Sequence, residues 1–258
     1  MNTCKHIVDA SALASNDIAL SLGGPRALAL QPARLDSHGF ELGRYPALLS
    51  PDYRRLQQET YAKLKPGINA TNQLARGTAW GVYVNGQINW QDRISYRLPA
   101  ELNPEEGGRI RVFTPIDRAF LEHPATVAMF FDIYACWNFP ESSYEVPYQV
   151  QLSAIRYEPT LSEPAMPSPV IPHQDAVDGV IVLMHKTPNL VGGLSRIYGL
   201  DGTPQWQVDL DPADALFVRD AQVLHQVTPI LLEPGARWAP GESAYRDVLL
   251  VRFQRVGR

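Results

Sequence analysis

Seven short segments rich in β-branched and aromatic residues follow one another through the second half of the chain, and they restrict the fold more than any other feature. They alternate apolar and polar positions, as strands with one buried face do. Gly and Pro turns separate them, and most of the connections are too short for a helix, which argues against a parallel α/β sheet. An antiparallel sandwich or barrel is favoured. The segments are residues 148–159, 177–186, 194–202, 204–212, 214–222, 225–233 and 245–255.

The part of the chain before residue 140 has helical patterns instead. Ser50 as N-cap and Pro51 at the first helical position predict a helix that ends before Gly67. Thr114 is the expected cap of a second helical stretch, which Pro124 splits in two. The predicted architecture is mainly β with a helical N-terminal part. We expect one domain over residues 1–258, with helical and mixed support over about 1–140 and the β core over about 144–256.

Composition limits the kind of partner. The 258 residues include 45% hydrophobic and 19% charged residues, with a formal net charge of −4 and no basic cluster. Basic residues are not clustered into a positive surface that would bind nucleic acid. No apolar stretch reaches the length of about 18 residues that spans a bilayer. The two cysteines, Cys4 and Cys136, are far apart and predict reduced thiols rather than a disulfide. We expect a cytoplasmic protein with a small-molecule partner, neither secreted nor membrane-anchored.

His173 and Asp175 stand two residues apart, just before an apolar segment. In extended chain, residues at this spacing point to the same side. Two titratable groups beside a core strand are costly to desolvate unless a metal ion or hydrogen bonds compensate them. His225, at the start of another predicted strand, offers a third ligand. Two imidazoles and one carboxylate are typical of non-haem iron(II) oxygenases, although each histidine alone could equally be a hydrogen-bonded structural residue.

A guanidinium is expected inside the same β core. Arg246 lies on the apolar segment 245–255, and a buried guanidinium needs an anionic partner. A dicarboxylate co-substrate would supply one. Gly192 and Gly193 suit a tight turn between strands.

Taken together, these motifs resemble the ferrous iron and 2-oxoglutarate dependent dioxygenases, and more narrowly the small bacterial free amino acid hydroxylases. The likeness covers roughly residues 105–255. It implies a double-stranded β-helix, or jelly roll, with iron(II) held by His173, Asp175 and His225. It also implies O₂ and 2-oxoglutarate as co-substrates. The far carboxylate of 2-oxoglutarate would bind Arg246 rather than Arg252, which we expect to lie further from the metal. Tyr157 and Thr228 resemble residues that contact the co-substrate in relatives.

The resemblance implies hydroxylation of an unactivated C–H bond of an aliphatic or cyclic free amino acid, with formation of succinate and CO₂. The carboxylate of Asp175 favours hydroxylation over halogenation. Arg156 is the first candidate for binding the substrate carboxylate, ahead of Arg111 and Arg76, although Arg156 and its neighbour Tyr157 should face opposite sides of a regular strand. Two other hypotheses remain open, a zinc or manganese hydrolase or isomerase of cupin type and a non-catalytic carboxylate-binding module. A homo-oligomer is possible. The remaining residues interpreted as structural are His6, His38, His123, His185, Trp80, Trp90 and Trp137.

Overall fold

The computed structural model describes residues 32–66, 73–84, 87–92, 95–97, 108, 110–137, 147–167, 169, 171–235 and 243–255. Its helices are α2 (Pro32–His38), the 3-10 helix η1 (Pro46–Leu49), α3 (Pro51–Ala62), α4 (Arg118–Leu121) and α5 (Pro124–Cys136). No helix among these residues is both long and apolar enough to cross a bilayer.

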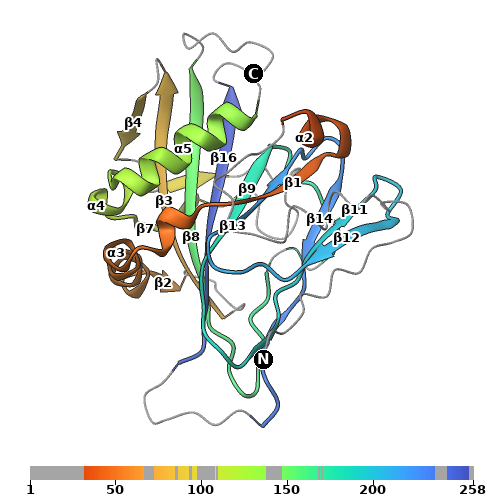
Figure 1. Ribbon diagram of the computed structural model, residues 1–258. Coiled ribbons are helices and arrows are strands. Elements are labelled where there is room, and N and C mark those ends of the chain that lie inside the picture. The colour runs from red at the N-terminus through yellow and green to blue at the C-terminus, as the bar shows by residue number, and fades with distance from the viewer. Residues whose placement is uncertain are drawn as a thin grey trace.

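A nine-stranded sheet forms the larger layer of the molecule, in the order β1-β13-β9-β16-β8-β3-β2, with β4 and β7 also paired to β3 (Figure 1). Its neighbouring strands are antiparallel except for the parallel pair of β3 and β7. Strand β16 lies at the centre, between β8 and β9. The strands are β1 (Phe40–Arg44), β2 (Lys65–Pro66), β3 (Leu74–Val84), β4 (Gln87–Gln91), β7 (Thr114–Pro115), β8 (Tyr148–Tyr157), β9 (Gly179–Lys186), β13 (Asp214–Val218) and β16 (Arg246–Arg255).

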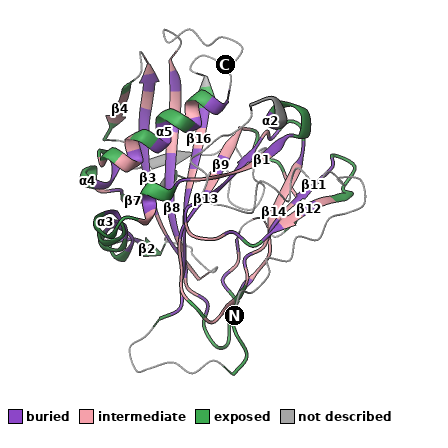
Figure 2. Ribbon diagram, in the orientation of Figure 1, coloured by how far each residue is buried: buried purple, intermediate pink, exposed green. Residues whose placement is uncertain are grey.

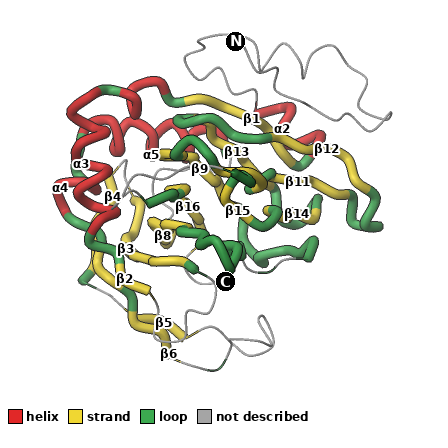
Figure 3. Tube along the Cα trace, turned by 90° about the horizontal axis from the view of Figure 1, so that it is seen from below, coloured by secondary structure: helices red, strands yellow, loops and turns green. Residues whose placement is uncertain are grey.

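Two smaller sheets form a second layer that faces β9, β13 and β16 (Figure 3). One has the order β12-β11-β14 and the other pairs β10 with β15. Their strands are β10 (Leu190–Gly192), β11 (Ser195–Tyr198), β12 (Pro204–Val208), β14 (Leu224–Val227) and β15 (Ile230–Leu232). A separate antiparallel pair joins β5 (Ser95–Arg97) to β6 (Ile110–Val112). The two facing layers form the predicted jelly roll.

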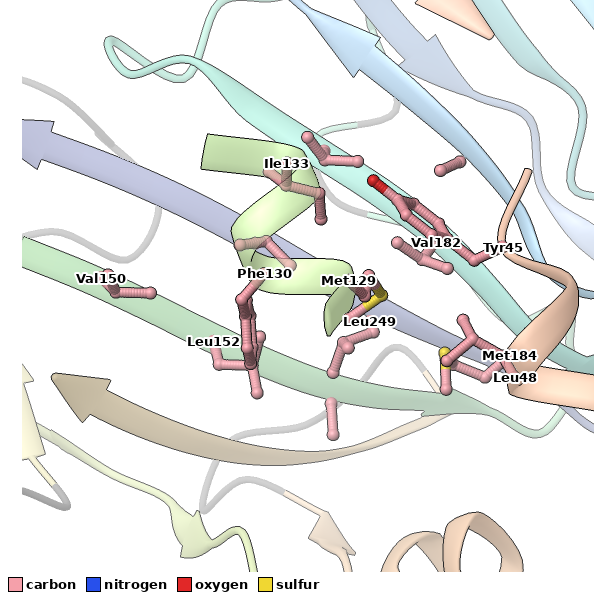
Figure 4. Close-up of a cluster of buried hydrophobic side chains, with 14 of the residues drawn as sticks. Tyr45, Leu48, Met129, Phe130, Ile133, Val150, Leu152, Val182, Met184 and Leu249 are labelled. Atoms are coloured by element: carbon pink, nitrogen blue, oxygen red, sulfur yellow. The ribbon is translucent and has the colours of Figure 1, made fainter. Parts of the chain in front are cut away.

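The large sheet is buried on both faces, because alternate residues of each strand enter different cores (Figure 2). Val150 and Leu152 of β8 and Leu249 of β16 pack against α5 and η1, as Figure 4 shows. Ile155 of β8 and Val248 of β16 point the other way, toward the second layer. A residue's place in the strand alternation therefore decides whether its side chain meets the helices or the inside of the jelly roll.

All seven predicted strand segments are strands, although Thr228 and Pro229 divide residues 225–233 between β14 and β15. The helical character of the N-terminal part is smaller than expected. The prediction missed β1, β3 and β4, and β3 is an eleven-residue strand of the main sheet. Its Gly and Ala content weakens a strand pattern that β8 stabilises by direct pairing. The single-domain organisation stays a prediction.

The helix predictions are partly confirmed. Helix α3 begins after Ser50, though the Ser50 side chain makes no capping hydrogen bond, and a new helix begins at Pro124 as expected. Thr114 as a helix cap is wrong, because Thr114 lies in β7 and Asp117 precedes α4. Cys136 is buried as a free thiol, and burial raises its pKa to about 12.

We predict that Leu152→Ala destabilises the fold strongly. Leu152 is fully buried between the sheet and α5, so its removal leaves a cavity that costs about 2–5 kcal/mol. Urea unfolding would measure the loss. The same substitution at Leu161, which is 89% exposed, serves as the control and should change the free energy of unfolding by less than about 0.5 kcal/mol. Equal effects at the two positions would contradict the described core.

Candidate metal centre

The candidate metal centre begins with a backbone contact between two segments distant in sequence. His173, before β9, and His225, in β14, form an isolated antiparallel bridge. Each donates its backbone N–H to the carbonyl of the other, at 3.0 Å in both directions. The two imidazole rings lie side by side, with centroids 4.4 Å apart. Asp175 follows two residues after His173 on the same extended segment.

The side chains of His173, Asp175 and His225 converge as the sequence predicted. Each offers a ligand atom, and these atoms lie within 4.8 Å of one another. The Nε2 atom of His173 is 3.9 Å from Asp175 Oδ1, and the Nε2 atom of His225 is 3.7 Å from Asp175 Oδ2. His173 Nδ1 lies 2.8 Å from the carbonyl of Ile171. A proton on Nδ1 would bond that carbonyl and leave Nε2 free to bind a cation.

The protonation states of the cluster also suit a cation. Burial lowers the pKa of His225 to about 4, so its imidazole is neutral at neutral pH. Burial acts to raise the pKa of Asp175, but Arg252 and the two histidines outweigh that effect and hold the pKa below its ordinary value. The neutral imidazole of His225, the ionised carboxylate of Asp175 and the imidazole of His173 are a donor set that iron(II) accepts.

Asp220, which the sequence analysis missed, holds the segment that carries Asp175. Its carboxylate accepts the backbone N–H of Asp175 at 2.6 Å and that of Ala176 at 2.7 Å. Its carbonyl accepts the side-chain amide of Gln174. The side chain of Asp178 accepts the N–H of Asp220 and a bond from Arg219. These bonds compensate a carboxylate that is only 6% exposed.

Arg252 corrects one expectation about the arginines. It was predicted to lie further from the metal than Arg246, but its Nη2 donates to Asp175 Oδ2 at 2.6 Å. Arg252 therefore lies at the metal end of β16 and Arg246 at the opposite end. The direction of the strand relative to the metal decides this order.

Arg246 is 2% exposed, and its Nε and Nη2 atoms have no hydrogen-bond partner among the described residues. Burial lowers its pKa, because the charge is desolvated without an acceptor. Tyr157 lies directly opposite on β8 and is 7% exposed. At Gly193, where φ is +68°, an added Cβ would lie 3.3 Å from Arg246 Nε. A buried guanidinium with two nitrogen atoms that lack an acceptor among the described residues fits a site for a carboxylate ligand.

Thr228 lies at the break between β14 and β15, and its backbone and side chain bond Leu194. Its hydroxyl accepts the Leu194 N–H and its own N–H donates to the Leu194 carbonyl, both at 3.0 Å. At Gly192 an added Cβ would lie 2.0 Å from the Pro229 carbonyl oxygen, so only glycine fits this close approach. Thr228 thus holds the Gly-Gly turn in place, and its contact with the co-substrate stays a prediction.

Arg156 is not brought to the metal cluster, and we withdraw it as the substrate ligand. Its Nε and Nη2 donate to the two oxygens of Asp247, each at 2.8 Å, and Gln57 donates to the same carboxylate. The guanidinium also stacks over Tyr245, 4.0 Å from the ring centre. These contacts lie on the helix-covered face of the sheet, opposite to Tyr157. Arg156 and Tyr157 therefore point to opposite faces of β8, as regular strand alternation predicts, and no bulge brings both side chains inward.

Of the other arginine candidates, Arg76 is on the inner face of β3, where its Nη2 donates to Ser153 Oγ at 3.3 Å. The side chain of Arg111 lies outside the described residues. His6 also lies outside them. The other residues interpreted as structural make structural contacts: His38 with Ser37, His123 as the cap of α5, His185 with Tyr245, Trp90 with Phe130, and Trp137 with Phe217; Trp80 is buried on the inner face of β3.

Comparison with known proteins identifies the family to which the chain belongs. The sequence signature described as 2OG-Fe dioxygenase matches residues 51–252. The chain belongs to this family of iron and 2-oxoglutarate dependent dioxygenases. Among solved structures, IDO from Bacillus thuringiensis superposes with a TM-score of 0.70 at 21% identity, covering 87% of this chain and 97% of that one. A bsmA homologue from Methylobium petroleophilum PM1 gives 0.73 at 21% identity, with 91% and 95% covered.

Two relatives carry specific names. The 3(1)-hydroxy-L-isoleucine 4-dioxygenase of Pantoea ananatis (strain AJ13355) is 28% identical over 187 residues, which is 69% of this chain and 74% of the relative. The L-isoleucine-4-hydroxylase of Bacillus thuringiensis is 28% identical over 162 residues, 61% of this chain and 64% of the relative. The second match therefore spans slightly less than two thirds of that relative's length.

We predict that Asp220→Asn weakens metal binding about tenfold or more, as the loss of a group that orients metal ligands generally does. The amide has one acceptor oxygen where the carboxylate has two, so one N–H of Asp175 or Ala176 loses its partner. Calorimetry with cobalt(II) would measure the affinity. Asp209→Asn, at a carboxylate that binds Lys186 and is 48% exposed, is the matched control and should bind cobalt like the wild type. Unchanged affinity in Asp220→Asn would refute this role.

We predict that Arg156→Met destabilises the protein by about 3–5 kcal/mol without changing cobalt affinity, because it leaves the buried carboxylate of Asp247 without its cationic partner. Chemical unfolding and calorimetry would measure the two effects. The double variant Arg156→Met/Asp247→Leu should recover much of the stability, since it removes the stranded charge as well. A single variant as stable as the wild type would contradict this structural role.

Proposed function

We propose that the protein is an iron(II) and 2-oxoglutarate dependent dioxygenase that hydroxylates a free L-amino acid. The observation that carries the proposal is Arg246, a buried guanidinium without an acceptor among the described residues, in the same jelly roll as the His173, Asp175 and His225 cluster. A metal site and a separate carboxylate site in one barrel are what 2-oxoglutarate requires, because the molecule offers a chelating end and a distant carboxylate.

Iron(II) held by His173, Asp175 and His225 would supply the redox chemistry that couples oxidative decarboxylation of 2-oxoglutarate by O₂ to hydroxylation of a C–H bond. The products are succinate, CO₂ and the hydroxylated amino acid. The two oxygen atoms of O₂ enter the succinate carboxylate and the new hydroxyl group, so atoms and electrons balance without a further reductant.

The chain's own residues position the reactants. The carbonyl of Ile171 orients the His173 ring, and Arg252 holds one oxygen of Asp175, which leaves the other oxygen for the metal. Arg246, with Tyr157 opposite, would bind the far carboxylate of 2-oxoglutarate and so fix its direction in the barrel. Thr228 would support this end through the Gly-Gly turn. Such positioning, rather than acid-base catalysis, is the protein's contribution.

The substrate proposal rests on the two named relatives and on the family-like motifs. Both relatives act, by their names, on isoleucine or a hydroxylated isoleucine, so aliphatic amino acids are tested first and cyclic imino acids second. The cupin-type hydrolase and the non-catalytic module are not favoured, because neither explains family membership together with a buried, unpaired Arg246. Screening free amino acids for substrate-dependent succinate formation tests the proposal, and an unresponsive enzyme with every amino acid would refute it. Cytoplasmic localisation, a possible homo-oligomer and the absence of nucleic-acid binding stay predictions.

We predict that Arg246→Met raises the KM for 2-oxoglutarate at least tenfold and leaves the KM for the amino acid within about twofold, because it removes a charge-assisted bond to one ligand only. Succinate formation at varied concentrations of each substrate would measure both constants. Arg55→Met, on the exposed face of α3, is the control and should behave as the wild type. Equal increases in the two constants would move the 2-oxoglutarate site away from Arg246.

A further inference from the structure

A second group of buried polar atoms lies on the inner face of the large sheet. Thr78 Oγ1 on β3, Gln151 Nε2 on β8 and Arg252 Nε on β16 are buried and have no hydrogen-bond partner among the residues that the structure describes. Thr78 as a whole is 2% exposed. Buried polar groups are normally paired, so three unpaired ones on adjacent strands point to a missing ligand.

The strand register places these atoms next to one another. Arg252 pairs with Gln151, and Gln151 pairs with Trp80 on the following strand. Thr78 lies two residues before Trp80, so it shares the inner face with Trp80 and is the diagonal neighbour of Gln151. Direct neighbours in antiparallel strands have Cβ atoms about 5 Å apart and diagonal ones about 7–8 Å. Gln151, on the strand between the other two, is therefore a neighbour of both Arg252 and Thr78, and a small molecule that contacts Gln151 lies next to all three side chains.

This row lies beside the metal cluster and away from Arg246. Arg252 bonds Asp175 through Nη2, which brings the row to the metal end of β16. Arg246 is at the first position of the same strand, on the same face, next to Tyr157. Among the described residues, unpaired donors thus lie at both ends of β16, and the metal cluster is beside the end that carries Arg252.

The chemistry of the row suits a carboxylate. The free atoms of Gln151 and Arg252 are both N–H donors, the guanidinium carries positive charge, and the hydroxyl of Thr78 can donate as well. The guanidinium of Arg76 adds a second positive charge one row further along, where it bonds Ser153 opposite Thr78. Donors and positive charge on one wall bind an anion and not an ammonium group.

We propose that Thr78, Gln151 and Arg252 bind the carboxylate of the substrate amino acid. This inference deepens the proposed function and rests on it. It assigns binding of the substrate carboxylate, which the sequence predicted for Arg156, to residues on the inner face of the large sheet. The substrate carboxylate then lies beside the metal cluster, on the side opposite to the 2-oxoglutarate carboxylate. The indole of Trp80, 7% exposed in the same row, lies against the bound molecule.

The test uses two variants that remove polar atoms and keep side-chain size, Thr78→Val and Gln151→Met. Each should raise the KM for the amino acid about tenfold and leave the KM for 2-oxoglutarate and the affinity for cobalt(II) unchanged. The melting temperature of the ligand-free protein should stay the same or rise, because a buried group without a partner is removed. If the hydroxyl of Thr78 or the amide of Gln151 only stabilised the fold, its removal would lower the melting temperature and leave the KM for the amino acid unchanged.

Thr126→Val is the matched control, since Thr126 is equally buried but its hydroxyl bonds Tyr53 on the helix-covered side. This variant should lower the melting temperature and leave both KM values unchanged.

The outcomes separate this inference from the proposed function. If the wild type forms succinate in response to an amino acid, but both variants keep its KM or raise the KM for 2-oxoglutarate instead, the carboxylate site is wrong and the function stands. Lower melting temperatures with unchanged KM values would also overturn the site, because they assign the two side chains to the fold. If no amino acid stimulates the wild type, the function is refuted and the inference falls with it.

Discussion

The geometry of the metal cluster depends on two backbone hydrogen bonds between His173 and His225. They join the segment that leads into β9 of the large sheet to β14 of the second layer. Side chains alone could not fix this geometry, because each imidazole rotates about two bonds. Once the backbone pair is made, Asp175 is placed by its spacing from His173, and Asp220 fixes the turn that presents it. The metal cluster is thus a property of strand pairing before it is a property of its ligands.

Buried charges divide into those that the protein neutralises and those that it leaves for a ligand. Arg156 and Asp247 satisfy each other with two parallel bonds on the helix-covered face, and Asp220 is satisfied by backbone amides. Arg246 has no acceptor among the described side chains, although it is only 2% exposed. Since an isolated buried charge costs several kcal/mol, this contrast identifies a ligand site more clearly than the shape of the barrel does.

The sequence predicted the strands of the second half and the pair of His173 and Asp175 well, because both depend on local order. The spacing of His173 and Asp175 and the alternation of apolar residues survive in any extended chain. What it could not give was the relation between distant segments. The position of Arg252 at the metal depends on which end of β16 lies beside Asp175. The role of Asp220 depends on a turn contact between separate loops, and β3 becomes a strand through its pairing with β8. The face of Arg156, by contrast, was deducible from alternation with Tyr157.

The bond between Arg252 and Asp175 has a consequence for electroneutrality. The guanidinium and the carboxylate cancel, so a divalent ion that binds the cluster leaves the centre with its full double positive charge. Together with Arg246, that excess matches the two negative charges of 2-oxoglutarate and leaves a single positive charge over. The guanidinium of Arg76 adds a further positive charge on the same inner wall, so the carboxylate of an amino acid meets more attraction after the ion is in place than before. Charge balance therefore favours an assembly in which the ion binds before either carboxylate ligand.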